Sequence, residues 1–582
     1  MRALGTILTA AAMTLSAPAA AQDAVGDWNG TLVAGPTTLR IVVHIARGAD
    51  GALGGTLDSP DQNVAGIALA GVTADGGSLS FTVPSVGGAY RASWDPAAAL
   101  WKGTWVQNQA PLPLDLRAGL PSGEAPSPPA ALPADWRPPA DSAVREMIAA
   151  RNAPRAGQGI VVGVLDPSGR RVISGGTGAG AAFDGRTLFE IGSISKVFTA
   201  LLLADMASKG EVSLDDPAEK YLPAGHHMPQ RGGRQITLRD LSTHVSGLPR
   251  LPSNMEMSDP DDPYRDYTEA QMLAFLDSYE LPRDIGAQWE YSNFGVGLLG
   301  YLLGRAAGKD YEALLRERIT GPLGMKDTAI TLPPALAARL APAFDPYMRP
   351  AKPWNLPTLM GAGGIRSTAD DMLTFAAAVL DPKSPIAPAV KTALAVRVPT
   401  GNAKVEQALG WQVVEVEPGR ELVLHDGGTG GFRSSLAIEP AKGTAAVVLI
   451  NTAIEPSATD LALHVLVGSP IAPTPPVPPP PPEPVRRVEV SLPQAELDRV
   501  TGRYEFAPGV VFSVVRDGNG LRAQREGAVT GPALPIFAES PLHFFWKAVD
   551  AQVLFTTDES GRVTGAVFTQ SGQSMTGKRL ED

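Results

Sequence analysis

The chain contains no cysteine among its 582 residues. This absence excludes disulfide bonds, a cysteine nucleophile, a lipid-bearing N-terminal cysteine and metal sites built on thiolate ligands. Basic residues are also scarce, because 49 Lys and Arg stand against 60 Asp and Glu, for a net charge of −11. Since nucleic acids are bound largely through phosphate neutralisation by Lys and Arg, this balance disfavours a nucleic-acid partner.

Long apolar runs are lacking after the N-terminus. Residues 1–21 combine Arg2 with an Ala- and Leu-rich stretch and end in Ala19-Ala20-Ala21, which fits a secretory signal with an A-x-A cleavage site. A short anchor helix is the alternative, but the stretch is interrupted by Thr and Ser and is short for a spanning helix of ~20 residues. We therefore expect a bacterial periplasmic or secreted protein with no stable membrane insertion after cleavage.

Two proline-rich stretches divide the chain, whose length predicts two to four domains at roughly 150 residues each. Proline fixes φ and lacks an N–H donor, so such stretches form extended spacers rather than packed core. The predicted division is a signal peptide at 1–21, a β domain at 22–120, a linker at 121–139, a mixed domain at 140–470, a linker at 471–485 and a second β domain at 486–582.

The two outer segments and the middle segment differ in their pattern of apolar and turn residues. Short β-rich runs separated by Gly-rich turns fill 22–120 and 486–582, which predicts a small sandwich or barrel in each. The segment 140–470 begins and ends with buried-strand patterns, Ile160–Leu165 and Ala445–Ile450, around helical patterns at 195–208, 269–278, 295–307, 311–319 and 369–380. This order predicts an α+β domain whose two chain ends share one sheet.

The first candidate for chemistry is Ser193, three residues before Lys196 at the start of an apolar helix. Residues three apart lie on one helical face, so the hydroxyl and the amine can meet. A serine is a poor nucleophile without a nearby base, and a buried lysine with a lowered pKa can serve as that base. The helix N-terminus adds N–H groups suited to a developing oxyanion. An N-cap serine beside a surface lysine is the structural alternative.

Two further motifs follow along the chain. Tyr291 and Asn293 stand just before an apolar helical run, where a phenol can relay a proton and an amide offers both a donor and an acceptor. The third motif, His425-Asp426-Gly427-Gly428, follows an apolar strand. Its glycines allow the backbone to approach a substrate closely, and a backbone N–H there can complete an oxyanion hole. A hairpin turn is the structural alternative.

The order and spacing of the three motifs resemble those of the β-lactamase-related serine hydrolases, which include class C β-lactamases, D-alanyl-D-alanine peptidases and family VIII esterases. The resemblance covers roughly 140–468 and implies a β-lactamase/transpeptidase-like fold, with an antiparallel sheet and a helical subdomain. Supporting stretches are Phe189–Gly192, Leu214–Pro217, Tyr221–Pro223, Ile236–Pro249, Pro322–Met325 and Gly363–Thr368. The segment 486–582 is similar to the lipocalin-like barrels that follow some family peptidases.

The resemblance also implies roles. Ser193 would be acylated, and Lys196 and Tyr291 would exchange its proton and later activate water. Asn293 would hold the substrate amide or orient the lysine, and the N–H groups of Ser193 and Gly428 would form the oxyanion hole.

The third motif departs from the family pattern. It is usually Lys-Thr-Gly, in which a cation and a hydroxyl help to hold a substrate carboxylate. Here His425, Asp426 and Gly427 stand in its place. A histidine is seen at this position in family esterases and peptidases, but Asp426 would repel an anionic group if it points into the site. Arg433 could compensate, and neither side-chain direction follows from the sequence. We expect His244 to be a structural hydrogen-bonding residue rather than a catalyst.

The sequence therefore predicts an exported hydrolase that forms an acyl-enzyme on a small-molecule or peptide substrate, without a metal or organic cofactor. Small esters or amides rank first, D-amino-acid peptides second and β-lactams third. A catalytically inactive envelope-binding protein is the alternative from another class, although a pure binder need not keep Ser193, Lys196 and Tyr291 together.

Overall fold

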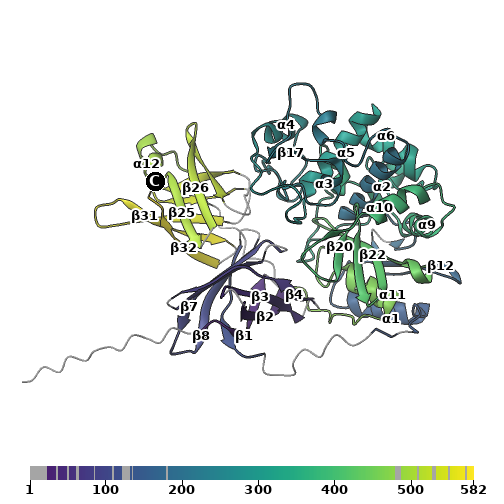
Figure 1. The fold of residues 1–582 in the computed structure, drawn as a ribbon, viewed down its shortest axis with the longest axis horizontal. Coiled ribbons are helices and arrows are strands. Elements are labelled where there is room, and N and C mark those ends of the chain that lie inside the picture. The colour runs from purple at the N-terminus through teal and green to yellow at the C-terminus, as the bar shows by residue number, and fades with distance from the viewer. Residues whose placement is uncertain are drawn as a thin grey trace, which may run out of the picture.

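The structure is a computed structural model that describes residues 23–34, 37–48, 51–60, 64–75, 77–83, 86–107, 110–120, 132–133, 135–178, 181–478, 487–507, 510–526, 533–547, 551–570 and 573–581. The predicted signal peptide, most of the first predicted linker and residues 479–485 of the second lie outside the described residues. Figure 1 shows an N-terminal β sheet, a large α+β body and a C-terminal β barrel.

The N-terminal part is all-β, as predicted. Its described strands form one antiparallel sheet in the order β4-β3-β2-β1-β10-β8-β7-β6-β5, with β9 paired to β8. Alternating apolar side chains fill its core, in which Trp28 packs edge-on against Trp94 and Trp101. The strands are β1 (Gly26–Ala34), β2 (Thr37–Arg47), β3 (Leu53–Ser59), β4 (Val64–Ala68), β5 (Ala70–Asp75), β6 (Ser78–Val83), β7 (Gly88–Asp95), β8 (Leu100–Gln107), β9 (Ala110–Pro113) and β10 (Leu116–Ala118).

The central antiparallel sheet of the α+β body confirms the prediction that the two ends of the segment 140–470 share one sheet. Its strand order is β12-β11-β24-β23-β22-β21-β20-β19, so that the first strands of the body pair with its last strand. The strands are β11 (Ile160–Asp166), β12 (Gly169–Gly175), β19 (Val398–Pro399), β20 (Val405–Gln407), β21 (Gln412–Glu417), β22 (Arg420–Gly428), β23 (Arg433–Glu439) and β24 (Thr444–Ile450). Two-residue strands form small ladders elsewhere, namely β13 (Thr177–Gly178) with β14 (Ala181–Ala182), β15 (Phe189–Glu190) with β18 (Arg366–Ser367), and β16 (Gln230–Arg231) with β17 (Arg234–Gln235).

Helices cover both faces of this sheet (Figure 1). One face packs against α1 and α11, and the other packs against a larger helical cluster that includes the largely buried α2. The predicted helices at 195–208, 269–278 and 369–380 are confirmed as α2, α4 and α9. The helices are α1 (Asp141–Asn152), α2 (Ser195–Ser208), α3 (Leu238–Ser242), α4 (Glu269–Ser278), α5 (Asn293–Ala307), α6 (Tyr311–Leu315), α7 (Pro334–Ala337), α8 (Met360–Gly363), α9 (Ala369–Leu380), α10 (Ala387–Ala395) and α11 (Ala458–Val467).

The C-terminal part is a closed antiparallel barrel preceded by a short helix, α12 (Gln494–Arg499). It contacts the α+β body where Ala533 N donates to Ser253 O at 2.8 Å and Arg522 pairs with Glu256 at 3.0 Å. The strands are β25 (Gly502–Ala507), β26 (Val510–Asp517), β27 (Gly520–Glu526), β28 (Leu534–Ser540), β29 (His543–Phe545), β30 (Ala551–Thr557), β31 (Val563–Gln570) and β32 (Gln573–Arg579).

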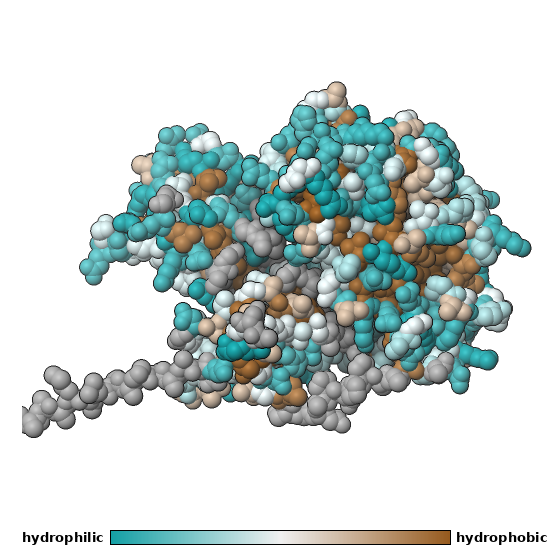
Figure 2. Space-filling view, in the orientation of Figure 1, coloured by the Kyte–Doolittle hydropathy of each residue, from teal (hydrophilic) through white to brown (hydrophobic). Residues whose placement is uncertain are grey.

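The face of the molecule shown in Figure 2 is mainly polar. In Figure 2 hydrophilic side chains cover most of the helical part and the barrel, and apolar side chains gather between the helical part and the sheet. Within the part of the chain that the structure describes, no helix combines the length and apolar character needed to cross a membrane.

Candidate active site

Ser193 lies in a 3-10 turn, Gly192–Ile194, that leads directly into α2. The turn is held on both sides, because Ile191 N donates to Ile365 O at 3.1 Å and Ser434 Oγ donates to Ile191 O at 2.8 Å. Since α2 is buried over most of its length, the serine stands on a rigid support at the helix N-terminus.

Lys196 projects from the first turn of α2 back toward the serine, as the three-residue spacing predicts. Its Nζ lies 3.0 Å from Ser193 Oγ and donates to the Ala362 carbonyl oxygen at 2.6 Å. The side chain is fully buried. Burial, helped by the nearby Arg250 guanidinium, holds the pKa of Lys196 well below its usual range, although Asp426 opposes the shift. A neutral amine in hydrogen-bond contact with a hydroxyl is equipped to accept its proton.

Tyr291 lies across the same hydroxyl. Its ring centroid is 4.9 Å from Lys196 Nζ, and its phenol hydrogen-bonds with Ser193. Burial raises the pKa of Tyr291 above its ordinary value, and the hydrogen bond with Ser193 lowers it by less. The phenol therefore keeps its proton at neutral pH and is able to donate it.

Asn293 opens α5 one residue after the N-cap Ser292, whose Oγ accepts from Gly295 N at 2.8 Å. The Asn293 Nδ2 group donates to the Tyr264 hydroxyl at 3.3 Å. Its Oδ1 atom is buried and has no hydrogen-bond partner among the described residues. A substrate N–H is a suitable donor for this unused acceptor, since buried polar atoms are normally paired.

The glycines of the third motif bring two backbone segments together. Gly427 and Gly428 end β22 and pair with β23 on one side, whereas the pairing of β22 with β21 extends only to Leu424. A β-carbon added to Gly427 would lie 2.0 Å from Ile191 O, and one added to Gly192 would lie 2.6 Å from Gly428 N. Only glycine permits this approach, which places the Gly428 N–H beside the turn that carries Ser193. The predicted oxyanion hole, formed by the N–H groups of Ser193 and Gly428, requires this closeness.

His425 and Asp426 occupy different environments on this strand. His425 is buried, and its Nδ1 lies 2.6 Å from the Asp426 carbonyl oxygen. Burial and the neighbouring Lys196 lower the pKa of His425 more than Asp426 raises it, so the imidazole is neutral at pH 7. The Asp426 side chain is exposed, and no hydrogen bond or ion pair reaches its carboxylate from the described residues. It nevertheless acts on Lys196 and Tyr291, raising the pKa of each.

Two arginines lie near the site, and they differ in whether the guanidinium is bonded within the protein. Arg433 donates to the carbonyl oxygens of Thr429, Phe432 and Ala453 at 3.0–3.1 Å, so its guanidinium is engaged within the protein. Arg250 was not identified from the sequence. Its side chain is exposed, and its Cζ lies 5.2 Å from the centroid of the Tyr291 ring. This cation–π contact places a positive charge beside the proposed acid–base pair.

We expect Arg250→Gln to move the acid limb of the kcat/KM profile to higher pH by roughly half a unit to one unit. The neutral amine is the active form of a base, so the rate rises as the pH passes through the Lys196 pKa. Arg250 lowers that pKa and Asp426 raises it, so Asp426→Asn should move the limb to lower pH. Stopped-flow or steady-state ester hydrolysis across pH measures both shifts. Shifts of the same sign would contradict this electrostatic assignment.

Arg145→Gln is the control for that series. Arg145 is exposed on α1, which packs on the sheet face opposite to α2. Exposed charges at such separations are largely screened by salt. The control profile should therefore overlie that of the wild type.

His244 fits its predicted structural role. Its Nδ1 accepts a hydrogen bond from Ser292 N at 3.1 Å, and its ring centroid lies 4.5 Å from that of Tyr291. Burial, helped by the nearby basic groups of Lys196, His425 and Arg250, holds its pKa well below the usual range, so the ring is neutral. It thereby positions the segment that carries Tyr291.

A buried ion pair supports the segment before the nucleophile. Glu190 and Arg366 face each other across the β15–β18 ladder at 3.0 Å, and they are 3% and 7% exposed. Removing one partner leaves the other charge buried and unpaired. We expect Arg366→Met to destabilise the protein by about 3–5 kcal/mol.

This loss is measured as the fall in the temperature at which half of the hydrolytic activity is lost. Lys209→Met is the control, because it breaks a surface i,i+4 pair with Asp205 worth roughly 0.3–0.5 kcal/mol. Equal losses of stability in the two variants would show that the buried ion pair contributes no more to stability than the surface pair.

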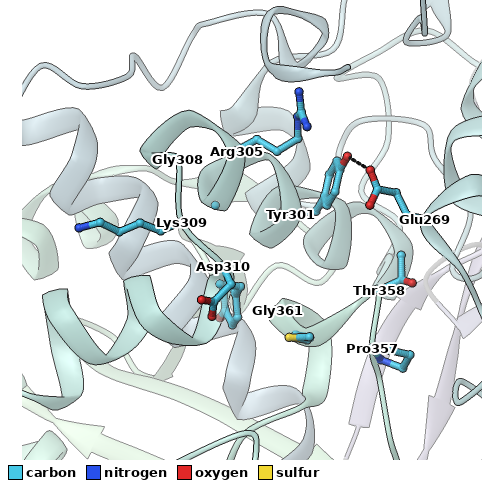
Figure 3. Close-up of a pocket in the computed structure, with 12 residues that line it drawn as sticks. Glu269, Tyr301, Arg305, Gly308, Lys309, Asp310, Pro357, Thr358 and Gly361 are labelled. Carbon is cyan, nitrogen blue, oxygen red and sulfur yellow. Dashed lines mark hydrogen bonds between the residues drawn. The ribbon is translucent and has the colours of Figure 1, made fainter. Parts of the chain in front are cut away.

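A separate hollow of about 550 Å³ lies among α4, α5, α6 and α8 and contains none of the predicted site residues (Figure 3). Its polar groups are used within the protein. Tyr301 donates to Glu269 at 2.5 Å, Asp310 accepts from Ala313 N at 2.8 Å, and Lys309 pairs with Glu317. We therefore assign the chemistry to the cluster formed by Ser193, Lys196 and Tyr291.

Comparisons with known proteins identify the family of the chain. The profile of the Beta-lactamase family matches residues 144–468, which are more than half of the chain, and the chain belongs to that family. It is a serine hydrolase of the β-lactamase and DD-peptidase kind. A second profile, a domain of unknown function (DUF3471), matches residues 486–581, the C-terminal barrel.

The relatives of this chain include peptidases, penicillin-binding proteins and β-lactamases. The D-alanyl-D-alanine-carboxypeptidase/endopeptidase AmpH of Escherichia coli strain K12 is 34% identical over 280 residues, which cover 45% of this chain and 71% of that protein. Penicillin-binding protein 4* of Bacillus subtilis strain 168 is 25% identical and covers 64% of this chain and 83% of its own length. The crystal structure of a class C beta lactamase from Rhodobacter sphaeroides, at 26% identity, aligns with a TM-score of 0.48 over 56% of this chain and 97% of that chain.

Proposed function

We propose that the protein is an exported serine hydrolase that forms an acyl-enzyme on Ser193 and acts on small esters or amides. The observation that carries the proposal is the contact between Ser193 Oγ and the buried Lys196 amine, 3.0 Å apart, with the Tyr291 phenol on the same hydroxyl. Burial holds the pKa of Lys196 well below its usual range and raises the pKa of Tyr291, which suits the lysine to act as the base and the tyrosine as the acid.

The chemistry follows from these assignments. Lys196 takes the proton of Ser193 as Oγ bonds to the substrate carbonyl carbon, and the N–H groups of Ser193 and Gly428 stabilise the oxyanion. As the tetrahedral intermediate collapses, the bond to the leaving group breaks and Tyr291 supplies a proton to that group. Water then attacks the acyl-enzyme, giving up a proton to the same pair of residues, and the free acid leaves while Ser193 regains its hydrogen.

Substrate class is the finer part of the proposal. Esters and amides without an anionic group rank first because His425 is neutral and Asp426 is negative where the family pattern has a cation and a hydroxyl. D-amino-acid peptides rank second, supported by the similarity to AmpH, and β-lactams rank third. A panel of chromogenic esters, D-Ala-D-Ala peptides and nitrocefin separates them. Location in the periplasm or outside the cell is proposed on the signal-like residues 1–21.

We expect Asp426→Thr to raise acylation by nitrocefin more than hydrolysis of a neutral aryl ester. The substitution removes a negative charge that opposes the β-lactam carboxylate and restores a hydroxyl donor, and like charges in close contact cost up to several kcal/mol. For the wild type, kcat/KM should be higher for the aryl ester than for nitrocefin. A wild-type preference for nitrocefin, or an unchanged ratio in the variant, would contradict this interpretation of the third motif.

A further inference from the structure

Among the described residues, the end of β22 and the neighbouring Arg433 provide no cation that is free to bind a substrate. The imidazole of His425 is neutral because it is buried beside Lys196. The guanidinium of Arg433 is occupied by three backbone carbonyl groups. The net charge that this strand end offers to a substrate is therefore the single negative charge of Asp426.

The Asp426 carboxylate is exposed, and no described residue hydrogen-bonds or ion-pairs with it. Its charge reaches the reaction centre, because it acts on both Lys196 and Tyr291. It is next to Gly427 and Gly428, the glycines that bring this strand against the turn of Ser193. An ionised carboxylate is an acceptor only, so its complement in a substrate is a donor, and the strongest is a cationic N–H group.

We propose that the active site selects substrates that present a protonated amine to Asp426, namely amides, esters or peptides with a free amino group close to the scissile carbonyl. This inference rests on the proposed acyl-enzyme function and names its substrate class. The ammonium group donates to the Asp426 carboxylate and supplies the positive charge that the strand end lacks. The preference is electrostatic, so it requires no change in the acyl-transfer steps.

The exposed Arg250, beside Tyr291, supports the opposite preference, since it would attract a carboxylate. We favour the amine because the Arg250 charge already faces the Tyr291 ring in a cation–π contact, whereas no hydrogen bond or ion pair reaches the Asp426 carboxylate from any described residue. The test therefore includes both signs of charge.

The experiment compares three p-nitroanilides of the same shape, derived from alanine, lactic acid and methylmalonic acid, which carry an ammonium, a hydroxyl and a carboxylate at one position. At pH 7 most of the amine is protonated, because an α-amino group titrates near ~7.7–8.0. We expect kcat/KM for the alanine derivative to exceed that for the lactic acid derivative by about tenfold, the effect of one close charge pair at intermediate dielectric. The carboxylate derivative should be the poorest, and raising the salt concentration should reduce the differences.

Variants assign the preference to one residue. Asp426→Asn should bring the alanine-to-lactate ratio close to one, and Asp426→Glu should keep a ratio well above one. Arg250→Gln removes a positive charge, so it should retain or increase the ratio. Each ratio compares two substrates on the same enzyme, so changes in the Lys196 pKa cancel.

The inference is overturned if the wild type prefers the hydroxyl or carboxylate derivative, or if Asp426→Asn leaves the ratio unchanged. Failure of the proposed function is distinguishable, because it would appear as no turnover of any derivative and no acylation of Ser193 by a phosphonate. Hydrolysis of all three derivatives at equal rates would keep the function and reject the amine preference.

Discussion

Ser193→Ala is expected to reduce turnover by at least ~10⁴-fold while leaving the fold nearly unchanged. The hydroxyl is the proposed acyl acceptor, and no other serine in the described structure lies within hydrogen-bond distance of Lys196 Nζ. The side chain is not the N-cap of α2, a position that belongs to Ile194, so its loss should have little effect on helix stability. Steady-state ester hydrolysis and circular dichroism measure the two effects.

Ser195→Ala is the matched control, two residues away. Ser195 Oγ accepts from Ile365 N at 3.1 Å in the buried interior, so its removal should cost about 1 kcal/mol of stability. That variant should still be acylated on Ser193. Hydrolysis by Ser193→Ala within about tenfold of the wild type, once contaminating hydrolases are excluded, would eliminate Ser193 as the nucleophile.

Lys196→Ala and Tyr291→Phe should each lower kcat/KM by at least ~10²-fold, as expected for groups that transfer protons in the transition state. Both contact the Ser193 hydroxyl and they contact each other, with Lys196 Nζ 4.9 Å from the Tyr291 ring centroid. The double variant should therefore lose much less than the product of the two single losses, because the residues act as one unit.

Lys209→Ala and Tyr301→Phe are the controls for this pair of substitutions, because they remove an amine and a phenol outside the site. Both controls should stay within about twofold of the wild type. Losses that multiply in the double variant would mean that the lysine and the tyrosine act independently, and the proposed division of roles would then be wrong.

The parts of the site that the sequence predicted depend on short spacings. Ser193 and Lys196 meet because a helix brings residues three apart onto one face, and the contact at 3.0 Å follows from that geometry. The glycines of the third motif could be interpreted in the same way, because a strand that approaches another backbone closely cannot carry a side chain there. The strand patterns at 160–165 and 445–450 likewise predicted one sheet, which the β11–β24 pairing confirms.

The remaining parts depend on contacts between distant segments. The carbonyl of Ala362, which holds Lys196, is 166 residues away along the chain and has no side-chain signature. Arg250 directly follows the family-like stretch ending at Pro249, but its position over Tyr291 is set by tertiary packing. The direction of Arg433 was also undetermined until its carbonyl partners were known. Sequence patterns predicted which residues can take part in catalysis, whereas the fold determines which charged groups are not already bonded within the protein.

The most direct test of the acyl-enzyme on Ser193 is intact-mass spectrometry of the full chain after treatment with a serine-reactive fluorophosphonate. The account predicts one adduct per chain in the wild type and in Ser195→Ala, located by peptide mapping to the peptide that contains Ser193, and none in Ser193→Ala. An adduct of equal yield in Ser193→Ala, an adduct mapped to another residue, or a folded wild-type protein that forms no adduct would contradict it.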